Sequence, residues 1–354
     1  MLSIFGQANW RSEVVGCRYS PTSLLLVFLT TIFSAQAMPA QDSSPSFSIV
    51  IHGGAGGDPS NWSEDYRKQR RDSLGKALDT GVEMLESGKS ALDVVEAVVR
   101  VMEDDPVFNA GRGCVLNEAG EHELDASIMD GRTLACGAVA AVKTAKHPVT
   151  LARKVMEQTK HVLLIGRGAE QFGLKAGVEQ ADADWFITDR KRDSWLRWKT
   201  GEKDASLHNP KAVKPGEEQL YLGTVGCVVL DNDGNLAAAT STGGLMGKRW
   251  GRVGDSPIIG AGNYADNRCC GVSGTGVGEE FIRLSVARDI AARMQYGGQD
   301  LKSAAAATIA ELPDDAGGVI AIDNQGNIAT PFNTPGMSRA SANSAGLRTI
   351  ELGK

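Results

Sequence analysis

A glycine followed by a threonine opens an apolar stretch at residues 223–231, which reads GTVGCVVLD. The β-branched residues of this short run predict a buried strand that starts at Thr224. Threonine is common in strands, so a lone Gly-Thr pair is most simply the start of an ordinary strand. The alternative is that the chain cuts itself between Gly223 and Thr224. Thr224 would then carry a free α-amine with a pKa near ~8, which can act as the base for its own hydroxyl.

The composition is typical of a soluble globular protein, with 42% apolar and 23% charged residues in a chain of 354. This length allows one large domain with an ample core. The formal net charge is -6, and the short basic clusters at 67–71 and 190–192 stand beside acidic residues. No basic stripe is available to neutralise phosphates, so nucleic acid is not an expected partner.

The first 37 residues have the pattern of a secretory signal peptide. An apolar run at 24–33 is too short to span a bilayer. Ala35-Gln36-Ala37 follows it and fits the small-x-small cleavage rule. We predict a cut after Ala37, a periplasmic or secreted protein, and no membrane attachment once the signal is removed. The mature chain, 38–354, is expected to form a single domain.

The cysteine pattern gives no sign of a disulfide framework or a metal site. Removal of Cys17 with the signal peptide would leave five of the six cysteines, an odd number, and no C-x-x-C spacing occurs. Buried free thiols are therefore expected. His122-Glu123 lacks the second histidine of an H-E-x-x-H motif, so metal catalysis is not expected either.

Alternation and helical periodicity occur on both sides of residue 224. The expected strands are 46–51, 123–129, 132–142, 161–165, 224–231, 236–241, 256–262 and 271–275, with a closing hairpin at 319–330. The expected helices are 60–87, one from the Ser90 capping box to the acids 103–105, 148–158, 168–175, 279–294 and 301–312. We expect those acids to be solvated. Such a pattern fits an α+β fold, a four-layer αββα sandwich of two mainly antiparallel sheets.

Two connections have their own signals. Asp130-Gly131 predicts a type I′ turn between two strands of a hairpin. At about 181–223 the apolar periodicity fades, which predicts an exposed, flexible linker that ends at the suspected cleavage point.

Several short motifs combine around this point. They are GTVG at 223–226, TSTGG at 240–244, GRVGDSP at 251–257 and SGTGVGEE at 273–280. With HGGAG at 52–56, FNAG at 108–111 and HELDA at 122–126, they resemble the plant-type L-asparaginase / isoaspartyl peptidase family of N-terminal-nucleophile hydrolases. The resemblance covers nearly everything from residue 46 onward. It implies the fold of those hydrolases and self-cleavage into an α subunit, 38–223, and a β subunit, 224–354.

The resemblance also implies catalytic roles. Thr224 matches the nucleophile that self-cleavage exposes, and Thr242 matches the threonine that hydrogen-bonds it. The hydroxyl of Thr275 and the N–H of Gly276 match an oxyanion hole, where one lost donor typically costs about a hundredfold or more in rate. Asn109 matches a loop residue near the nucleophile. Outside this context, Thr242 would be read as a turn threonine.

Substrate recognition is implied for Arg252, Asp255, Thr275, Gly276 and Gly278. The chemistry agrees for the first two, because a guanidinium fork binds an α-carboxylate in two parallel bonds and a carboxylate binds an α-ammonium. Such a pair selects zwitterionic amino acids. Without the resemblance, the two residues would be read as an exposed ion pair on a turn.

The implied activity is hydrolysis of the side-chain amide of L-asparagine and of β-aspartyl dipeptides, with release of L-aspartate. Two alternatives stay open. A glycosylasparaginase-like amidase would use the same nucleophile and need room for a sugar. A non-catalytic exported binding protein for acidic amino acids would use Arg252 and Asp255 alone and would not cleave itself.

Two further features follow only from the resemblance. The loop after the second helix matches one that holds a structural alkali cation (Na+) through backbone carbonyls, and no other cofactor is implied. Its expected ligands are Met102, Glu103, Asp105, Phe108, Ala110 and Arg112. The resemblance also implies a dimer of αβ heterodimers.

Overall fold

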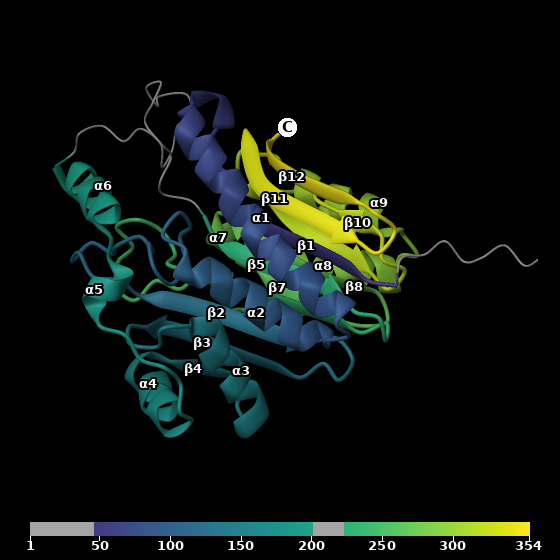
Figure 1. The fold of residues 1–354 in the computed structure, drawn as a ribbon, viewed down its shortest axis with the longest axis horizontal. Coiled ribbons are helices and arrows are strands. Elements are labelled where there is room, and N and C mark those ends of the chain that lie inside the picture. Colours follow the sequence, from purple (N-terminus) through teal and green to yellow (C-terminus); the bar gives the residue numbers. More distant parts are fainter. Residues whose placement is uncertain (1–45, 201–222) are drawn as a thin grey trace, which may run out of the picture. The chain divides into compact units, whose positions relative to one another are not determined.

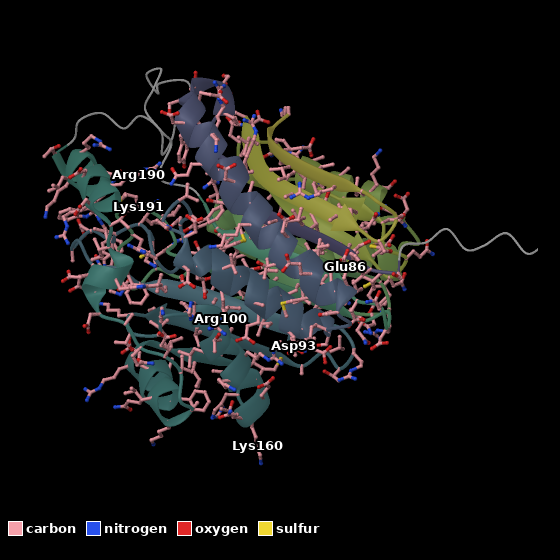
Figure 2. All side chains as sticks on the ribbon, in the orientation of Figure 1. Glu86, Asp93, Arg100, Lys160, Arg190 and Lys191 are labelled. Carbon is pink, nitrogen blue, oxygen red and sulfur yellow. The ribbon has the colours of Figure 1, made fainter. Side chains whose placement is uncertain are left out.

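The computed structural model describes residues 46–200 and 223–354 (Figure 1). The predicted signal peptide, 1–37, and the second part of the predicted linker lie outside the described residues. In the described part of the chain, no helix is both long and apolar enough to cross a membrane.

Two sheets form the centre of the domain (Figure 1). The larger has the strand order β12-β11-β1-β5-β6-β2-β3-β4, and every neighbouring pair is antiparallel except β3 with β4. Its strands are β1 (Ser48–Gly56), β2 (Leu124–Asp130), β3 (Cys136–Val142), β4 (Leu163–Ile165), β5 (Val225–Leu230), β6 (Leu236–Thr242), β11 (Gly336–Asn343) and β12 (Arg348–Gly353). The smaller sheet has the order β10-β9-β8-β7 and is antiparallel. Its strands are β7 (Asn263–Ala265), β8 (Cys270–Gly276), β9 (Gly317–Asp323) and β10 (Ile328–Ala329).

Helices cover both outer faces. On the larger sheet lie α1 (Glu64–Glu86), α2 (Ala91–Asp104), α3 (Pro148–Gln158) and α4 (Gly166–Lys175). On the smaller sheet lie α8 (Val286–Gln295) and α9 (Leu301–Ala310). The remaining helices are η1 (Pro59–Asn61), α5 (Ala183–Phe186), α6 (Asp189–Thr200) and α7 (Gly278–Leu284). The predicted four-layer αββα sandwich is confirmed.

Alternation along the central strands decides which side chains face the gap between the sheets. On β5, Cys227 and Val229 pack in the core beneath the helices of the larger sheet. Val228 packs in the core shared with the smaller sheet. Because side chains alternate along a strand, Thr224 and Gly226 face the smaller sheet, as Val228 does. The start of β5 is therefore directed at β8.

The predicted linker is exposed or half-exposed over most of residues 181–200, but this part is helical rather than irregular and contains α5 and α6. The reason is a set of aromatic anchors that sequence periodicity did not reveal. Phe186 is fully buried, and Trp195 donates from Nε1 to the carbonyl of Asn117 at 2.8 Å. Trp198 packs so closely on the loop after β6 that a Cβ on Gly247 would lie 2.0 Å from its ring.

The expected strand at 256–262 is a series of turns instead. The carbonyl of Asp255 accepts hydrogen bonds from the N–H groups of Ile258 and Gly262, at 2.9 and 3.2 Å. These local bonds replace a strand ladder, and β7 begins only at Asn263. The expected helix at 279–294 is divided by Ser285, whose left-handed backbone (φ 49°) separates α7 from α8.

Other local predictions also need correction. Asp130-Gly131 does not form a type I′ turn: the Asp130 carboxylate binds the N–H of Arg132 and the hydroxyl of Thr133, and Leu134 takes the positive φ. The expected strand at 161–165 is reduced to Leu163–Ile165, and as β4 it forms a sheet edge whose residues are exposed or half-exposed. Strands β11 and β12 were not predicted, because their small and polar residues give no apolar run.

The cysteines agree with the prediction. Cys114, Cys136, Cys227, Cys269 and Cys270 are all free thiols, and all but the half-buried Cys136 are buried.

Candidate active site

Thr224 lies at the entrance to β5 and is 8% exposed. Its Oγ1 is 3.2 Å from Oγ1 of Thr242, the last residue of β6, and donates to it. Thr242 Oγ1 also accepts the N–H of Gly244 at 3.0 Å. With both lone pairs occupied, the proton of Thr242 is directed to a third group. The structure therefore places the two predicted threonines in direct hydrogen-bond contact.

Gly223, the residue before Thr224, lies against backbone from the end of β1. A Cβ on Gly54, whose φ is +115°, would lie 2.5 Å from the Cα of Gly223. The glycine-rich end of β1 thus allows the chain to pass against the Gly223–Thr224 bond. Asn109 borders the same bond: a Cβ on Gly223 would lie 3.5 Å from the Cβ of Asn109. The Asn109 amide donates to the carbonyl of Gly244 at 2.9 Å and accepts the N–H of Val115 at 2.8 Å.

Thr275 and Gly276 end β8. Thr275 is buried, and its Oγ1 accepts the N–H of Ala55 at 3.1 Å. That bond occupies a lone pair and leaves the hydroxyl proton available to a bound carbonyl oxygen. Gly276 has φ +154°, and a Cβ there would lie 2.1 Å from the carbonyl oxygen of Ala316. Only glycine fits this position.

Arg252, Asp255 and Gly278 converge. A Cβ on Gly278 would lie 2.8 Å from Nη2 of Arg252 and 3.0 Å from Oδ1 of Asp255. Asp255 is 4% exposed, and its Oδ2 has no hydrogen-bond partner in the described part of the chain. Neither residue is an exposed surface charge, which removes the alternative interpretation of a turn ion pair. A buried carboxylate oxygen without a partner is expensive unless a ligand completes it.

Glu279 is a site residue that the sequence did not reveal. It binds Arg252 in a fork, with Nε donating to Oε1 at 2.9 Å and Nη2 donating to Oε2 at 2.8 Å. Glu279 directly follows Gly278 in the motif at 273–280, and that adjacency is the only signal that could have indicated it. The pairing fixes the plane of the guanidinium.

The charges around Asp255 shift its protonation. Burial raises the pKa of Asp255 to about 7, nearby Arg252 lowers it, and the like charges of Glu279 and Asp125 raise it. Hydrogen bonding from Arg252 holds the pKa of Glu279 below its usual range. A cationic group brought beside Asp255 would favour its charged form.

A family model described as "Asparaginase" matches residues 45–351, which include every residue placed above. The chain belongs to this family. The N-terminal-nucleophile fold and the resemblance inferred from the motifs are thereby confirmed. An isoaspartyl peptidase of Escherichia coli K12 is 48% identical over 296 residues, covering 82% of this chain and 91% of the relative.

Eukaryotic relatives match similarly. A probable isoaspartyl peptidase/L-asparaginase 2 of Arabidopsis thaliana is 41% identical over 322 residues, or 86% of this chain and 98% of the relative. An isoaspartyl peptidase/L-asparaginase of Danio rerio is 43% identical over 297 residues, or 83% and 91%.

Further polar groups surround the asparaginase-family site. Lys248 is buried, donates to the carbonyl of Glu123 at 2.9 Å, and lies 3.9 Å from Oδ2 of Asp125. Asp125 stands opposite Thr242 in the β2–β6 register. The HELDA stretch contains both acids, but the sequence did not indicate that a buried lysine would join them.

The predicted cation loop is tightly wound. The carbonyls of Met102, Glu103 and Asp105 accept N–H groups of Asp105, Arg112 and Phe108 respectively. Each of these carbonyl oxygens has a second lone pair, and oxygen atoms are the ligands that a hard cation prefers. The described residues contain no cluster of three or more metal-ligating side chains.

The prediction that the acids at the end of α2 are solvated is wrong for Glu103. Its Oε1 accepts the Ser241 hydroxyl at 2.6 Å and the Val149 N–H at 3.1 Å, and its side chain is fully buried. Burial raises the pKa of Glu103 to about 8.

Proposed function

We propose that this chain is an autoprocessing threonine amidohydrolase, an isoaspartyl peptidase and L-asparaginase that releases L-aspartate. Its substrates are L-asparagine and β-aspartyl dipeptides, in line with the names of its relatives. The observation that carries the proposal is the buried Thr224 hydroxyl, 3.2 Å from Thr242 and directly after Gly223. A threonine in this position can become a terminal nucleophile.

Self-cleavage comes first. The Thr224 hydroxyl adds to the carbonyl carbon of Gly223, the C–N bond to Thr224 breaks, and the nitrogen takes up a proton. The acyl group has then moved from nitrogen to oxygen, and water hydrolyses the resulting ester. The products are a carboxylate on Gly223 and a free α-amine on Thr224. Gly223 itself adds no side chain near the attacked carbon.

Turnover uses the new terminus. The α-amine of Thr224 accepts the proton of its hydroxyl, and Oγ1 attacks the β-amide carbon of the substrate. The Thr275 hydroxyl and the Gly276 N–H donate to the oxyanion. Ammonia or an amino acid leaves with the transferred proton, and a β-aspartyl ester remains on Thr224. Water then releases aspartate and restores the hydroxyl.

The charged cluster selects the substrate. Arg252, oriented by Glu279, binds the α-carboxylate, and the unpartnered Oδ2 of Asp255 accepts the α-ammonium. The Gly278 backbone borders both groups. This arrangement favours a free amino-acid head and places the side-chain amide toward Thr224.

The test compares the wild-type protein with Thr224→Ala. On a denaturing gel the wild type should give two fragments produced by a cut between Gly223 and Thr224, and the variant should give one uncut chain. In an activity assay the variant should release no aspartate. A variant that still processed and hydrolysed would overturn the assignment. Parallel assays of L-asparagine, a β-aspartyl dipeptide and glycosylasparagine separate the amidase alternatives. An intact, inactive wild type would favour the binding-protein alternative.

We also propose export after a cut at Ala37, a dimer of αβ heterodimers, and a structural Na+ in the loop of Met102, Glu103, Asp105, Phe108, Ala110 and Arg112. The signal-peptide pattern supports the export cut, and the family resemblance supports the dimer. The second lone pairs of the loop carbonyls support the Na+ site. N-terminal sequencing tests the export cut, and light scattering tests the dimer. The Na+ site is tested by comparing the melting temperature of the protein in Na+ with that in a bulky organic cation. If the loop binds Na+, the melting temperature should be higher in Na+.

A further inference from the structure

The imidazole of His52 contacts the backbone of Thr224, the proposed nucleophile. It is 0% exposed, with Nδ1 2.9 Å from the backbone carbonyl oxygen of Thr224 and Nε2 3.0 Å from Oγ of Ser273. A carbonyl oxygen can only accept, so Nδ1 must carry the proton. His52 thus joins the two sheets at the residue that performs the chemistry.

The rest of the network fixes this tautomer. Burial lowers the pKa of His52 to about 3, so the ring is neutral and Nε2 has a lone pair. With Nε2 as an acceptor, the Ser273 hydroxyl donates to it, which leaves Thr240 Oγ1 as the donor in its 2.7 Å contact with Ser273 Oγ. Thr240 Oγ1 also lies 3.1 Å from the carbonyl oxygen of Gly262, an alternative acceptor that already receives the Gly274 N–H at 2.9 Å. These directions agree with the Nδ1–H tautomer that the Thr224 carbonyl requires.

The surrounding backbone leaves space for this bond. A Cβ on Gly226 would lie 2.0 Å from Ser273 Oγ and 2.3 Å from His52 Nε2. The hydrogen bond between His52 and Ser273 therefore requires a glycine at this position of the GTVG motif. The ladder between β1 and β5 ends at the pair His52–Gly226, and β1 shifts register after His52. The side chain of His52 therefore supplies a donor to Thr224 just beyond the end of the ladder.

We propose that His52 is a positioning residue that holds the backbone of Thr224 through Nδ1–H while Thr242 holds its hydroxyl. The inference rests on the proposed self-cleavage. Once residue 223 is released, Thr224 loses its covalent anchor on that side, and rotation about its Cα–C bond would move amine and hydroxyl together. Two hydrogen bonds at opposite ends of the residue prevent this. A displacement of about 1 Å from attack geometry can cost on the order of a hundredfold in rate.

Two substitutions separate positioning from packing. An asparagine amide nitrogen can stand where Nδ1 stands, and a glutamine amide nitrogen where Nε2 stands. We expect H52N to keep kcat and self-cleavage within about tenfold of the wild type, and H52Q to lose on the order of a hundredfold in both. KM should change little in either, because the head-binding groups are untouched. His161→Gln, at an exposed position, is the matched control.

The role of His52 would be overturned if the two variants lost equal amounts of kcat and self-cleavage, or if H52Q were more active than H52N. It would also be overturned if the only change were in KM. A measurement on the unmutated protein adds a test that needs no variant. With only five histidines in the chain, ¹⁵N-histidine NMR should show one Nδ1–H tautomer that does not titrate between about pH 5 and pH 9. An Nε2–H tautomer at His52 would contradict the inference. An active, cleaved wild type with failed His52 predictions leaves the proposed function intact, whereas an uncut, inactive wild type removes both.

Discussion

The two ends of the proposed active site are built from different kinds of groups. At the nucleophile end, Thr224, Thr242 and Thr275 come from strand termini of both sheets, and their partners are neutral: hydroxyls, backbone N–H groups and an uncharged imidazole. At the head-binding end, Arg252 and Asp255 lie on the long connection between β6 and β7, and Glu279 lies in the first turn of α7. That end is dense in charge.

This difference separates two tasks. Bond formation needs reacting atoms held within a fraction of an ångström, which paired strands provide. Recognition of a zwitterion needs fixed opposite charges, and those can stand on a loop if turns and a fork hold them. Self-cleavage uses the first end and no substrate head. Substitutions at the two ends should therefore affect processing and turnover differently.

The largest effect is expected from Thr242→Val, which removes the hydroxyl while keeping the shape. Thr224 Oγ1 loses its hydrogen-bond partner, so both self-cleavage and kcat should fall by about 10²–10⁴-fold, with KM nearly unchanged. Time-resolved gels and steady-state kinetics measure the two rates. Normal processing with a lost kcat would show that Thr242 serves only the mature enzyme.

Asp255→Asn should give the opposite pattern. The substrate ammonium would lose its buried charged partner, which costs about 2–4 kcal/mol, or roughly 30- to 1000-fold in kcat/KM. Self-cleavage should proceed at the wild-type rate, because no ammonium takes part in it. A variant that stays uncut would show that the head-binding residues also affect self-cleavage, and it would contradict the separation of the two tasks.

The pH dependence should be the mildest effect. Asp255 has a raised pKa of about 7, so it becomes neutral as the pH falls below that value and no longer attracts an ammonium. We expect protonation of Asp255 to lower kcat/KM by up to about tenfold per pH unit below pH 7, in addition to the fall that the Thr224 amine causes. That amine must be neutral, with a reference pKa near ~8. In Asp255→Asn only the amine should remain in the profile. A wild-type profile no steeper than that of Asp255→Asn between pH 7 and pH 5 would contradict the assignment of Asp255.

Sequence patterns indicated candidate residues where short motifs carry a family resemblance. Gly223 and Thr224 were indicated by the motifs around them, since a Gly-Thr pair alone predicts an ordinary strand. Arg252 and Asp255 were indicated by the same resemblance, and their charges agree with the recognition of an amino-acid head. Periodicity located the long helices and central strands, whose apolar spacing repeats over many residues.

The failures have two causes. Residues 256–262 form turns rather than a strand because the N–H groups of Ile258 and Gly262 bond the carbonyl of Asp255. Helix α6 forms where a linker was expected because Trp195 and Trp198 dock on residues far away in sequence. His52, Lys248 and Glu279 were missed because their significance lies in partners brought from other elements. No local pattern reports such contacts.

The sequence alone determined the residue types: a glycine-preceded threonine, a glycine-rich strand end, and an arginine and an aspartate in one short motif. Those properties are covalent and local, so they can be read along the chain. Only the tertiary structure decided which lone pairs are filled, which carboxylate is left without a partner, and which tautomer His52 adopts. Burial and hydrogen bonding between distant strands set these states, because a polar group removed from water must be satisfied by whatever the fold brings beside it.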